Sequence, residues 1–386
     1  MENKAQNKTA QLPKMHRFDF LLFAVLMLIC AFGLVMLYSA SYYYGITHQG
    51  DGSYFVKRQL VFFAAGLALM IGLSFVKYTF YKKAAPFAYA AVVALLVYTL
   101  IAGVRLNEAT RWINIAGFQF QPSELAKFTL VIVLATIMCS KWKWLDMQSF
   151  FKGVVPCLVP LVPLAFLIIK QPNLSTILIL AFTTYAMLYL GGVKLSHRFV
   201  LIVLGFSAVV AYILIKGSYH SDRIYSYFHP NADPTGANYQ SLQSRIALGS
   251  GGFFGKGFDL SRQKFNFLPE RENDYILAII GEELGFFGCF LLLAAYFFAV
   301  IRGTSIALRC RDRFGRLIAG GLTAVLAIQV ILNVGVVTSA IPATGQTLPF
   351  VSYGGTSLMV YMAAMGILLN VSRYTEVKQK NVRRTE

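Results

Sequence analysis

The chain has 386 residues, of which 57% are hydrophobic and only 13% are charged, whereas about a quarter of the residues of a soluble domain are charged. This composition excludes a water-soluble globular protein and indicates that a lipid bilayer is the main solvent. The formal net charge of +18 would suggest nucleic-acid binding in a soluble protein. In a membrane protein a basic excess is expected on the cytoplasmic side, so we expect no nucleic-acid partner.

Apolar segments of roughly 20 residues, long enough to cross the hydrocarbon core of a bilayer, recur along the sequence. We predict an all-α polytopic membrane protein of about ten transmembrane helices, forming one membrane domain over residues 18–373. The predicted spans are 20–40, 60–76, 84–103, 125–140, 153–169, 174–192, 199–215, 275–301, 317–337 and 353–371.

The distribution of Lys and Arg predicts the orientation. If the N-terminus lies inside, basic residues concentrate in the cytoplasmic segments and are few in the short outside connections. Residues 1–17 are therefore a predicted cytoplasmic N-terminal segment, and residues 374–386 a predicted cytoplasmic tail. The first apolar run has full membrane length and no small-residue cleavage pattern after it. We therefore expect it to be a transmembrane helix and not a cleaved signal peptide.

The segment RWINIAGFQFQPSELAKFTL leads into the fourth predicted span. Pro122 and Ser123 interrupt the chain before a helix, and Glu124 and Lys127 lie three residues apart on one helical face, which permits an ion pair. An anionic headgroup that enters from outside could compete for Lys127, and the forked guanidinium of Arg111 could meet a phosphate. Taken alone, such a pair is more often structural.

Residues 216–274 form a long predicted extracellular loop between the seventh and eighth helices, rich in Gly, Tyr, Ser and charge. Compact proteins rarely keep loops of this length unless the loops function. The glycine-rich stretch 247–258 invites comparison with a phosphate-binding loop, but it lacks the Walker spacing with a final Lys followed by Ser or Thr. The sequence therefore argues against ATP binding.

Acidic residues lie at and after the end of this loop. Asp274 precedes an apolar run, so we expect its carboxylate at the outer membrane surface, where partial desolvation suits it to accept a proton from a sugar hydroxyl. The alternative is a helix cap that binds backbone N–H groups. Glu282 and Glu283 follow at predicted membrane depth, where either an ion pair inside the bundle or a metal or substrate role would explain them.

The stretch AIPATGQTLPFVSYGGTS lies between the last two predicted spans and combines prolines and glycines with hydroxyls and no charge. Irregular backbone at a membrane is tolerated only where protein or a water-lined cavity satisfies its polar groups. We predict that this stretch is a re-entrant wall of an outward-facing cavity. An ordinary turn rich in Pro and Gly is the alternative.

Four long motifs, in order, resemble the SEDS family of bacterial shape, elongation, division and sporulation proteins. They are RWINIAGFQFQPSELAK, DPTGANYQSLQSRIALGSGGFFGKGF, SRQKFNFLPERENDYILAIIGEELG and IPATGQTLPFVSYGGTSLM. The resemblance implies a peptidoglycan glycosyltransferase that polymerises lipid II at the outer face of the bacterial cytoplasmic membrane, with inversion and release of undecaprenyl diphosphate. It also implies association with a class B penicillin-binding protein, a transpeptidase, and with other division-complex proteins.

The same resemblance implies roles for individual residues. Asp274 matches the catalytic aspartate and is the candidate general base, and a divalent cation, Mg²⁺ or Mn²⁺, is the suspected cofactor with unknown ligands. The sequence departs from the family pattern at Asn173, Ser175 and Asn273, where Asp, Gly and Thr are usual. The predicted substrate-binding residues are Arg111, Gln121, Ser123, Glu124, Lys127, Glu270, Ser352, Gly354 and Gly355.

Within the family, NVGVVTSAIPATGQTLPF and GILLNVSRYTE are more similar to FtsW- and SpoVE-type members than to RodA-type members. This favours synthesis during cell division, with localisation at the division septum, and leaves a RodA-type elongation polymerase as the alternative. Two further alternatives belong to other classes of protein. A lipid II flippase would need the same cavity and basic residues but no base. A noncatalytic scaffold of the division complex would not depend on the Asp274 carboxylate.

Overall fold

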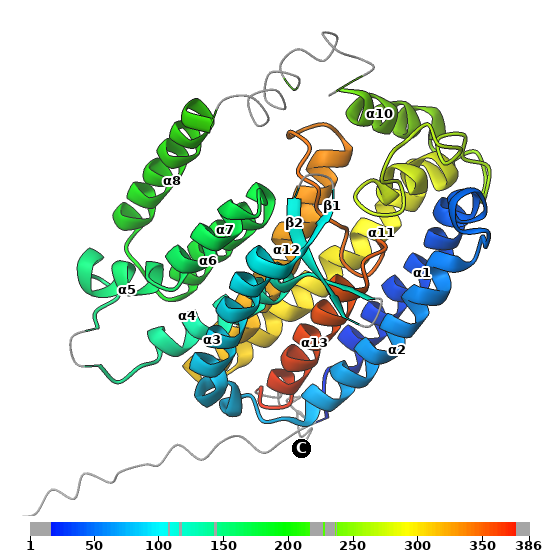
Figure 1. Ribbon diagram of the computed structural model, residues 1–386. Helices are drawn as coiled ribbons and strands as arrows, with labels where there is room; N and C mark the ends of the chain where they lie inside the picture. The colour runs from blue at the N-terminus through cyan, green and yellow to red at the C-terminus, as the bar shows by residue number, and fades with distance from the viewer. Residues whose placement is uncertain are drawn as a thin grey trace, which may run out of the picture.

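The computed structural model describes residues 17–106, 109–115, 118–142, 145–216 and 238–375, together with residues 227 and 236. The predicted terminal segments 1–17 and 374–386 therefore lie almost wholly outside the described residues, as does most of 217–237. Helices dominate what is described, and they pack side by side into a bundle (Figure 1).

Each of the ten predicted spans coincides with helical structure. Within the described residues, seven helical segments are long and apolar enough to cross a membrane, and α4, α7 and the apolar part of α8 are shorter. The helices are α1 (Phe20–Gln49), α2 (Tyr54–Phe75), α3 (Thr79–Ala102), α4 (Pro122–Met138), the π-helix η1 (Phe150–Val154), α5 (Val155–Leu158), α6 (Leu161–Lys170), α7 (Leu174–Leu190), α8 (Leu195–Lys216), α10 (Tyr239–Gly251), α11 (Ile276–Arg309), α12 (Arg313–Val337) and α13 (Gly355–Ser372).

Two predicted spans are interrupted. The segment predicted as one helix over 153–169 is divided into η1, α5 and α6. Pro160, which lacks a backbone N–H, stands between α5 and α6 and accounts for that break. The helix predicted over 275–301 extends to Arg309, and it is interrupted at Gly285, which has φ +67° and ψ −166°. Helix α10 lies inside the predicted long loop and packs on α11.

A three-stranded antiparallel sheet precedes α4, and the prediction of a helical protein did not include it. Its strands β1 (Val104–Leu106), β2 (Ala109–Ile115) and β3 (Phe118–Phe120) follow one another in space in the order β1-β2-β3. Ile113 pairs with Phe120 in the second ladder. Alternation of aromatic and β-branched residues in this segment is the local signal for a strand.

Helix α13 forms the centre of the bundle (Figure 1), packed against α2, α4, α11 and α12. Of the 18 residues of α13, 83% are buried within the molecule, against 22% of the residues in the apolar 18-residue stretch of α2. The side-chain amide of Asn370 fixes its end, because it donates to the Ser74 carbonyl at 2.7 Å and accepts from the Tyr78 N–H at 2.9 Å.

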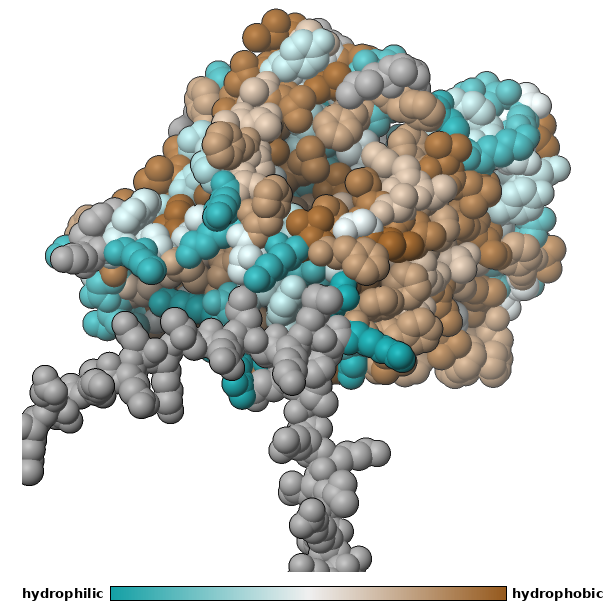
Figure 2. Space-filling model, turned by 90° about the horizontal axis from the view of Figure 1, so that it is seen from below, coloured by the Kyte–Doolittle hydropathy of each residue, from teal (hydrophilic) through white to brown (hydrophobic). Residues whose placement is uncertain are grey.

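Hydrophobic residues cover much of the surface visible in Figure 2, and hydrophilic residues gather in clusters among them. Large apolar side chains such as Phe87, Ile101 and Phe151 are about four-fifths exposed. An exposed apolar surface of this extent is expected where lipid replaces water, and the chain is a multi-span membrane protein.

The contact between α2 and α13 depends on glycine. A Cβ on Gly366 would lie 2.4 Å from the Met70 carbonyl oxygen, so Gly366→Ala forces the two backbones apart. We expect the free energy of unfolding to fall by about 1–3 kcal/mol, which would be measured as a lower Tm in detergent. The matched control is Gly72→Ala on α2, where a Cβ meets nothing within 4 Å. Equal Tm values for the two variants would contradict this packing.

Candidate functional site

The connection between α12 and α13, residues 338–354, is irregular, and protein side chains satisfy its backbone. Gln59 of α2 donates to the Ser352 carbonyl at 3.0 Å and accepts from the Gly354 N–H at 3.3 Å. Gln329 and Asn333 of α12 donate to the carbonyls of Thr347 and Gln346 at 3.0 Å and 2.7 Å. The backbone of this stretch is therefore irregular and bound by protein side chains. Its role as the re-entrant wall of an outward-facing cavity stays a prediction.

Asp274 lies against this connection. Asn333 donates to the Asp274 carbonyl at 2.8 Å as well as to Gln346, so a single amide joins the two segments. The half-buried Asp274 side chain faces Gly345, and a Cβ added to Gly345 would lie 3.5 Å from Oδ2. Tyr275 occupies the N-cap position of α11, so Asp274 stands one residue outside the position that a helix cap would take.

Glu124 and Lys127 form the ion pair that their spacing predicts, at 2.8 Å, and both side chains are buried. Lys127 also donates to Gln329 Oε1 at 2.7 Å, and Tyr361 donates to the same oxygen at 2.6 Å. Ser357 donates to Glu124 at 3.0 Å. Because Gln329 also binds Thr347, this network supports the connection from within, and the Lys127 ammonium does not reach the molecular surface.

Arg111 of β2 joins the sheet to the turn before α7. Its guanidinium donates to the Gln171 carbonyl at 3.0 Å and also to the Pro172 carbonyl. The two nearby departures from the family pattern have structural partners. Asn173 caps α7 by accepting from the Thr176 N–H at 3.3 Å, and Ser175 donates to the Thr344 carbonyl. The sheet, α7 and the connection therefore meet at one place.

The remaining predicted residues lie in the turn before Asp274, in the connection and at the start of α13. Asn273 donates to Glu270 at 2.6 Å within the turn, where Glu270 has φ +53°. Ser352 accepts from the Leu348 N–H at 2.8 Å. A Cβ on Gly355 would lie 2.2 Å from the Phe62 ring, so glycine permits this close approach.

The start of α4 adds a buried hydroxyl to the same region. Gln121 occupies the N-cap position of α4 and makes no side-chain capping bond, and its carbonyl accepts from the Glu124 N–H at 3.1 Å. The elements that meet here carry buried polar atoms whose hydrogen-bonding capacity no described protein group uses, a property of places that hold buried water. They are Ser123 Oγ, Gln171 Oε1, Thr176 Oγ1, Asn333 Oδ1 and Thr344 Oγ1.

Glu282 and Glu283 are bound in ion pairs. Lys256 lies 2.6 Å from Glu282, and Lys264 lies 3.2 Å from Glu283. Among the residues that the structure describes, no group of three or more His, Cys, Asp or Glu side chains could hold a metal ion. Of the two sequence interpretations of Glu282 and Glu283, the structure supports the ion pair.

Sequence reasoning missed Gln59, Gln329 and Asn333, which hold the irregular connection. The available signal was a side-chain amide inside an apolar span, a costly placement that implies a buried partner.

These features identify the class of protein. It is a multi-span helical membrane protein with a polar site, where an irregular connection meets a half-buried aspartate. Residues 19–377 match the FtsW/RodA/SpoVE family, described as cell cycle proteins. The chain therefore belongs to this family, the SEDS family.

Relatives span nearly the whole chain. Stage V sporulation protein E of Bacillus subtilis is 41% identical over 360 residues, which are 92% of this chain and 97% of that protein. A probable peptidoglycan glycosyltransferase FtsW of Trichlorobacter lovleyi is 37% identical over 366 residues, 93% of this chain and 94% of that one. A chain from a peptidoglycan synthase complex that coordinates polymerisation and crosslinking superposes with a TM-score of 0.76 at 28% identity, covering 92% of this chain and 98% of its own.

Removal of Lys127 leaves Glu124 buried without its counter-ion. We expect Lys127→Met to lower the free energy of unfolding by about 3–5 kcal/mol, since an uncompensated buried charge is strongly destabilising. The double variant Glu124→Gln with Lys127→Met removes that charge and should recover most of the lost Tm. A double variant less stable than Lys127→Met alone would contradict the buried pair.

Glu272 provides a pH-dependent prediction. Burial raises the pKa of its carboxyl above the usual 4.5. An acid with a raised folded-state pKa contributes stability below its unfolded pKa, and that contribution is lost as pH rises through the folded value. Glu272→Gln should therefore raise Tm at neutral pH, and the gain should vanish as the pH approaches 4.5. A gain of equal size at every pH would refute the burial effect.

Proposed function

We propose that this chain is a peptidoglycan glycosyltransferase that polymerises lipid II, with Asp274 as the general base. The observation that carries the proposal is the placement of Asp274. Its half-buried carboxylate faces Gly345, and Asn333 fixes its backbone to the irregular connection. The name of the FtsW relative as a probable peptidoglycan glycosyltransferase supports the same reaction.

In the proposed reaction, the 4-hydroxyl of an acceptor N-acetylglucosamine attacks the anomeric carbon of a donor N-acetylmuramic acid. The new glycosidic bond forms as the bond to the diphosphate oxygen breaks, which inverts the anomeric carbon and releases undecaprenyl diphosphate. The Asp274 carboxylate accepts the hydroxyl proton, and its partial burial limits competition from water.

The departing diphosphate requires positive charge. Arg111 is the proposed source, because its guanidinium lies on β2 beside the turn that leads into α7 and is only partly buried. Buried Lys127 acts through the Glu124–Gln329 network that holds the connection.

Asp274 is the residue that would hold a divalent cation at this site, because Mg²⁺ is commonly held by one or two carboxylates together with substrate phosphates. When bound, the ion neutralises charge on the leaving group.

The basic residues of the sequence support an orientation with both termini in the cytoplasm and the Asp274 site on the outer face. The isoprenoid tail of lipid II would then stay in the bilayer while its sugars reach the connection. The likeness to a chain of a complex that couples polymerisation to crosslinking supports a class B penicillin-binding protein as partner. The description of the family as cell cycle proteins and the similarity to an FtsW relative support work at the division septum, with other division-complex proteins, over a RodA-type role in elongation.

The proposed base is tested with Asp274→Asn, which keeps the side-chain volume and removes the proton acceptor. We expect polymerisation of purified lipid II, in vesicles containing Mg²⁺ and the partner transpeptidase, to fall by roughly 10²- to 10⁴-fold. Lipid II binding should remain, because the asparagine keeps the local packing. The product is measured as glycan chain length on gels.

Other outcomes identify other functions. Full polymerisation by Asp274→Asn would refute the base. A wild-type chain that moves lipid II headgroups across vesicles without joining them would be a flippase. Cells that divide normally with Asp274→Asn at unchanged protein level would point to a noncatalytic scaffold.

A further inference from the structure

The first part of α11 is a separate helical section. Helical geometry over Ile276–Arg309 is broken at Gly285, where φ is +67° and ψ is −166°. The section before the break begins one residue after Tyr275, so its position determines where Asp274 lies. Because the break removes the rigid continuity with the membrane-spanning remainder of α11, other contacts must fix the section.

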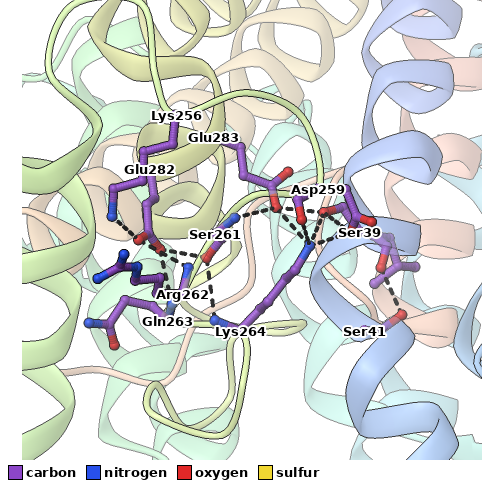
Figure 3. A network of polar contacts seen from close by, with 11 residues as sticks. Ser39, Ser41, Lys256, Asp259, Ser261, Arg262, Gln263, Lys264, Glu282 and Glu283 are labelled. Atoms are coloured by element: carbon purple, nitrogen blue, oxygen red, sulfur yellow. Dashed lines mark hydrogen bonds and ion pairs between the residues drawn. The ribbon is translucent and has the colours of Figure 1, made fainter.

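Glu282 and Glu283 stand at the end of this section and make those contacts (Figure 3). Glu282 is 1% exposed and accepts hydrogen bonds from side chains and from backbone N–H groups of the segment before it. Its donors are Ser250 Oγ at 3.3 Å, Lys256 Nζ at 2.6 Å, Ser261 Oγ at 2.5 Å, Arg262 N at 3.2 Å and Gln263 N at 3.1 Å.

Glu283 joins the same segment to α1. Its carboxylate is fully buried, accepting from Ser39 of α1 at 2.6 Å and from Lys264 at 3.2 Å. Lys264 in turn pairs with Asp259, whose side chain is 60% exposed. We call Lys256, Asp259, Lys264, Glu282 and Glu283 the carboxylate cluster. It connects α1, the segment 256–264 and the first section of α11.

The backbone confirms how closely these segments approach. The N–H groups of Lys256 and Gly257 donate to the carbonyls of Glu282 and Glu283, each at 3.0 Å. A Cβ on Gly255 would lie 2.1 Å from the Glu283 carbonyl oxygen. Residues 251–264 thus wrap the end of the section, and the chain continues from Lys264 to the turn that carries Asp274.

We propose that Glu282 and Glu283 are positioning residues for Asp274: through the carboxylate cluster they hold the first section of α11 against α1 and so place the base at the irregular connection. The inference rests on the proposed function, since it concerns that base. Among the hydrogen bonds and ion pairs of the described residues, neither carboxylate reaches the connection. Hydrogen bonds between the two buried carboxylates and two lysines are directional and depend on charge. They therefore fix the orientation of the section, which an apolar contact between the same segments would not do.

The test uses Glu282→Gln, which removes the charge and turns an amide N–H toward a set of donors. In the full-length protein in lipid nanodiscs, we expect faster hydrogen exchange at Arg262 and Gln263 and, beyond the cluster, at residues 270–275. The kcat for lipid II polymerisation should fall roughly 10- to 100-fold, because small misplacements of a reacting group have effects of this size. The KM for lipid II should be unchanged, since a positioning residue acts on the reacting group and not on substrate binding.

The matched control is Asp51→Asn, which breaks the exposed ion pair with Lys57 between α1 and α2, formed at 2.7 Å. It should change neither exchange at 270–275 nor kcat. Ser39→Ala, a milder change that removes one donor to Glu283, should shift both quantities in the same direction as Glu282→Gln. This variant keeps the test decisive if Glu282→Gln does not fold.

Faster exchange confined to Arg262 and Gln263, with wild-type exchange at 270–275 and wild-type kcat, would overturn the proposal. A raised KM with unchanged kcat would overturn it too, since it would indicate substrate binding. If Asp274 is not the base, the results differ from those that overturn the positioning role. In that case Asp274→Asn stays active, while Glu282→Gln still speeds hydrogen exchange at residues 270–275.

Discussion

The structure depends on how the N–H and C=O groups of an irregular backbone find hydrogen-bond partners inside a helical membrane bundle. Residues 338–354 form neither helix nor strand, and lipid offers their N–H and C=O groups no hydrogen-bond partners. Three buried amides, Gln59, Gln329 and Asn333, take over the part that water plays in a soluble loop. Because Asn333 serves Asp274 at the same time, the requirement for satisfaction also sets the geometry of the site.

Buried charged residues also hold irregular backbone in place, and they do so at two positions in the bundle. Glu124 and Lys127 are buried among α4, α12 and α13, where they reach the connection through Gln329. Glu282 and Glu283 are buried at the break in α11, where they reach the segment that leads to Asp274. Both pairs lie away from the proposed reacting atoms, and both act on the backbone beside them. Buried charge in this protein is mainly a means of holding irregular segments in place.

The sequence predicted the parts of this arrangement that leave a local signal. Apolar length predicted helical segments at all ten positions, of which seven within the described residues are long and apolar enough to cross a membrane. The Pro- and Gly-rich composition predicted the irregular connection, and the i,i+3 spacing predicted the Glu124–Lys127 pair. The sheet was missed because β1 and β3 are three residues each, too short for their alternation to stand out. The pairing of Glu282 with Lys256 was beyond reach, because it depends on how a long connection folds back on α11.

The close approach of Gly355 to the Phe62 ring has an evolutionary consequence. The two residues share one volume across α2 and α13, so neither position can enlarge unless the other shrinks. Homologues with a bulkier residue in place of Gly355 should therefore carry a smaller one in place of Phe62. A covarying pair of this kind would mark, in sequence alone, the place where the central helix begins.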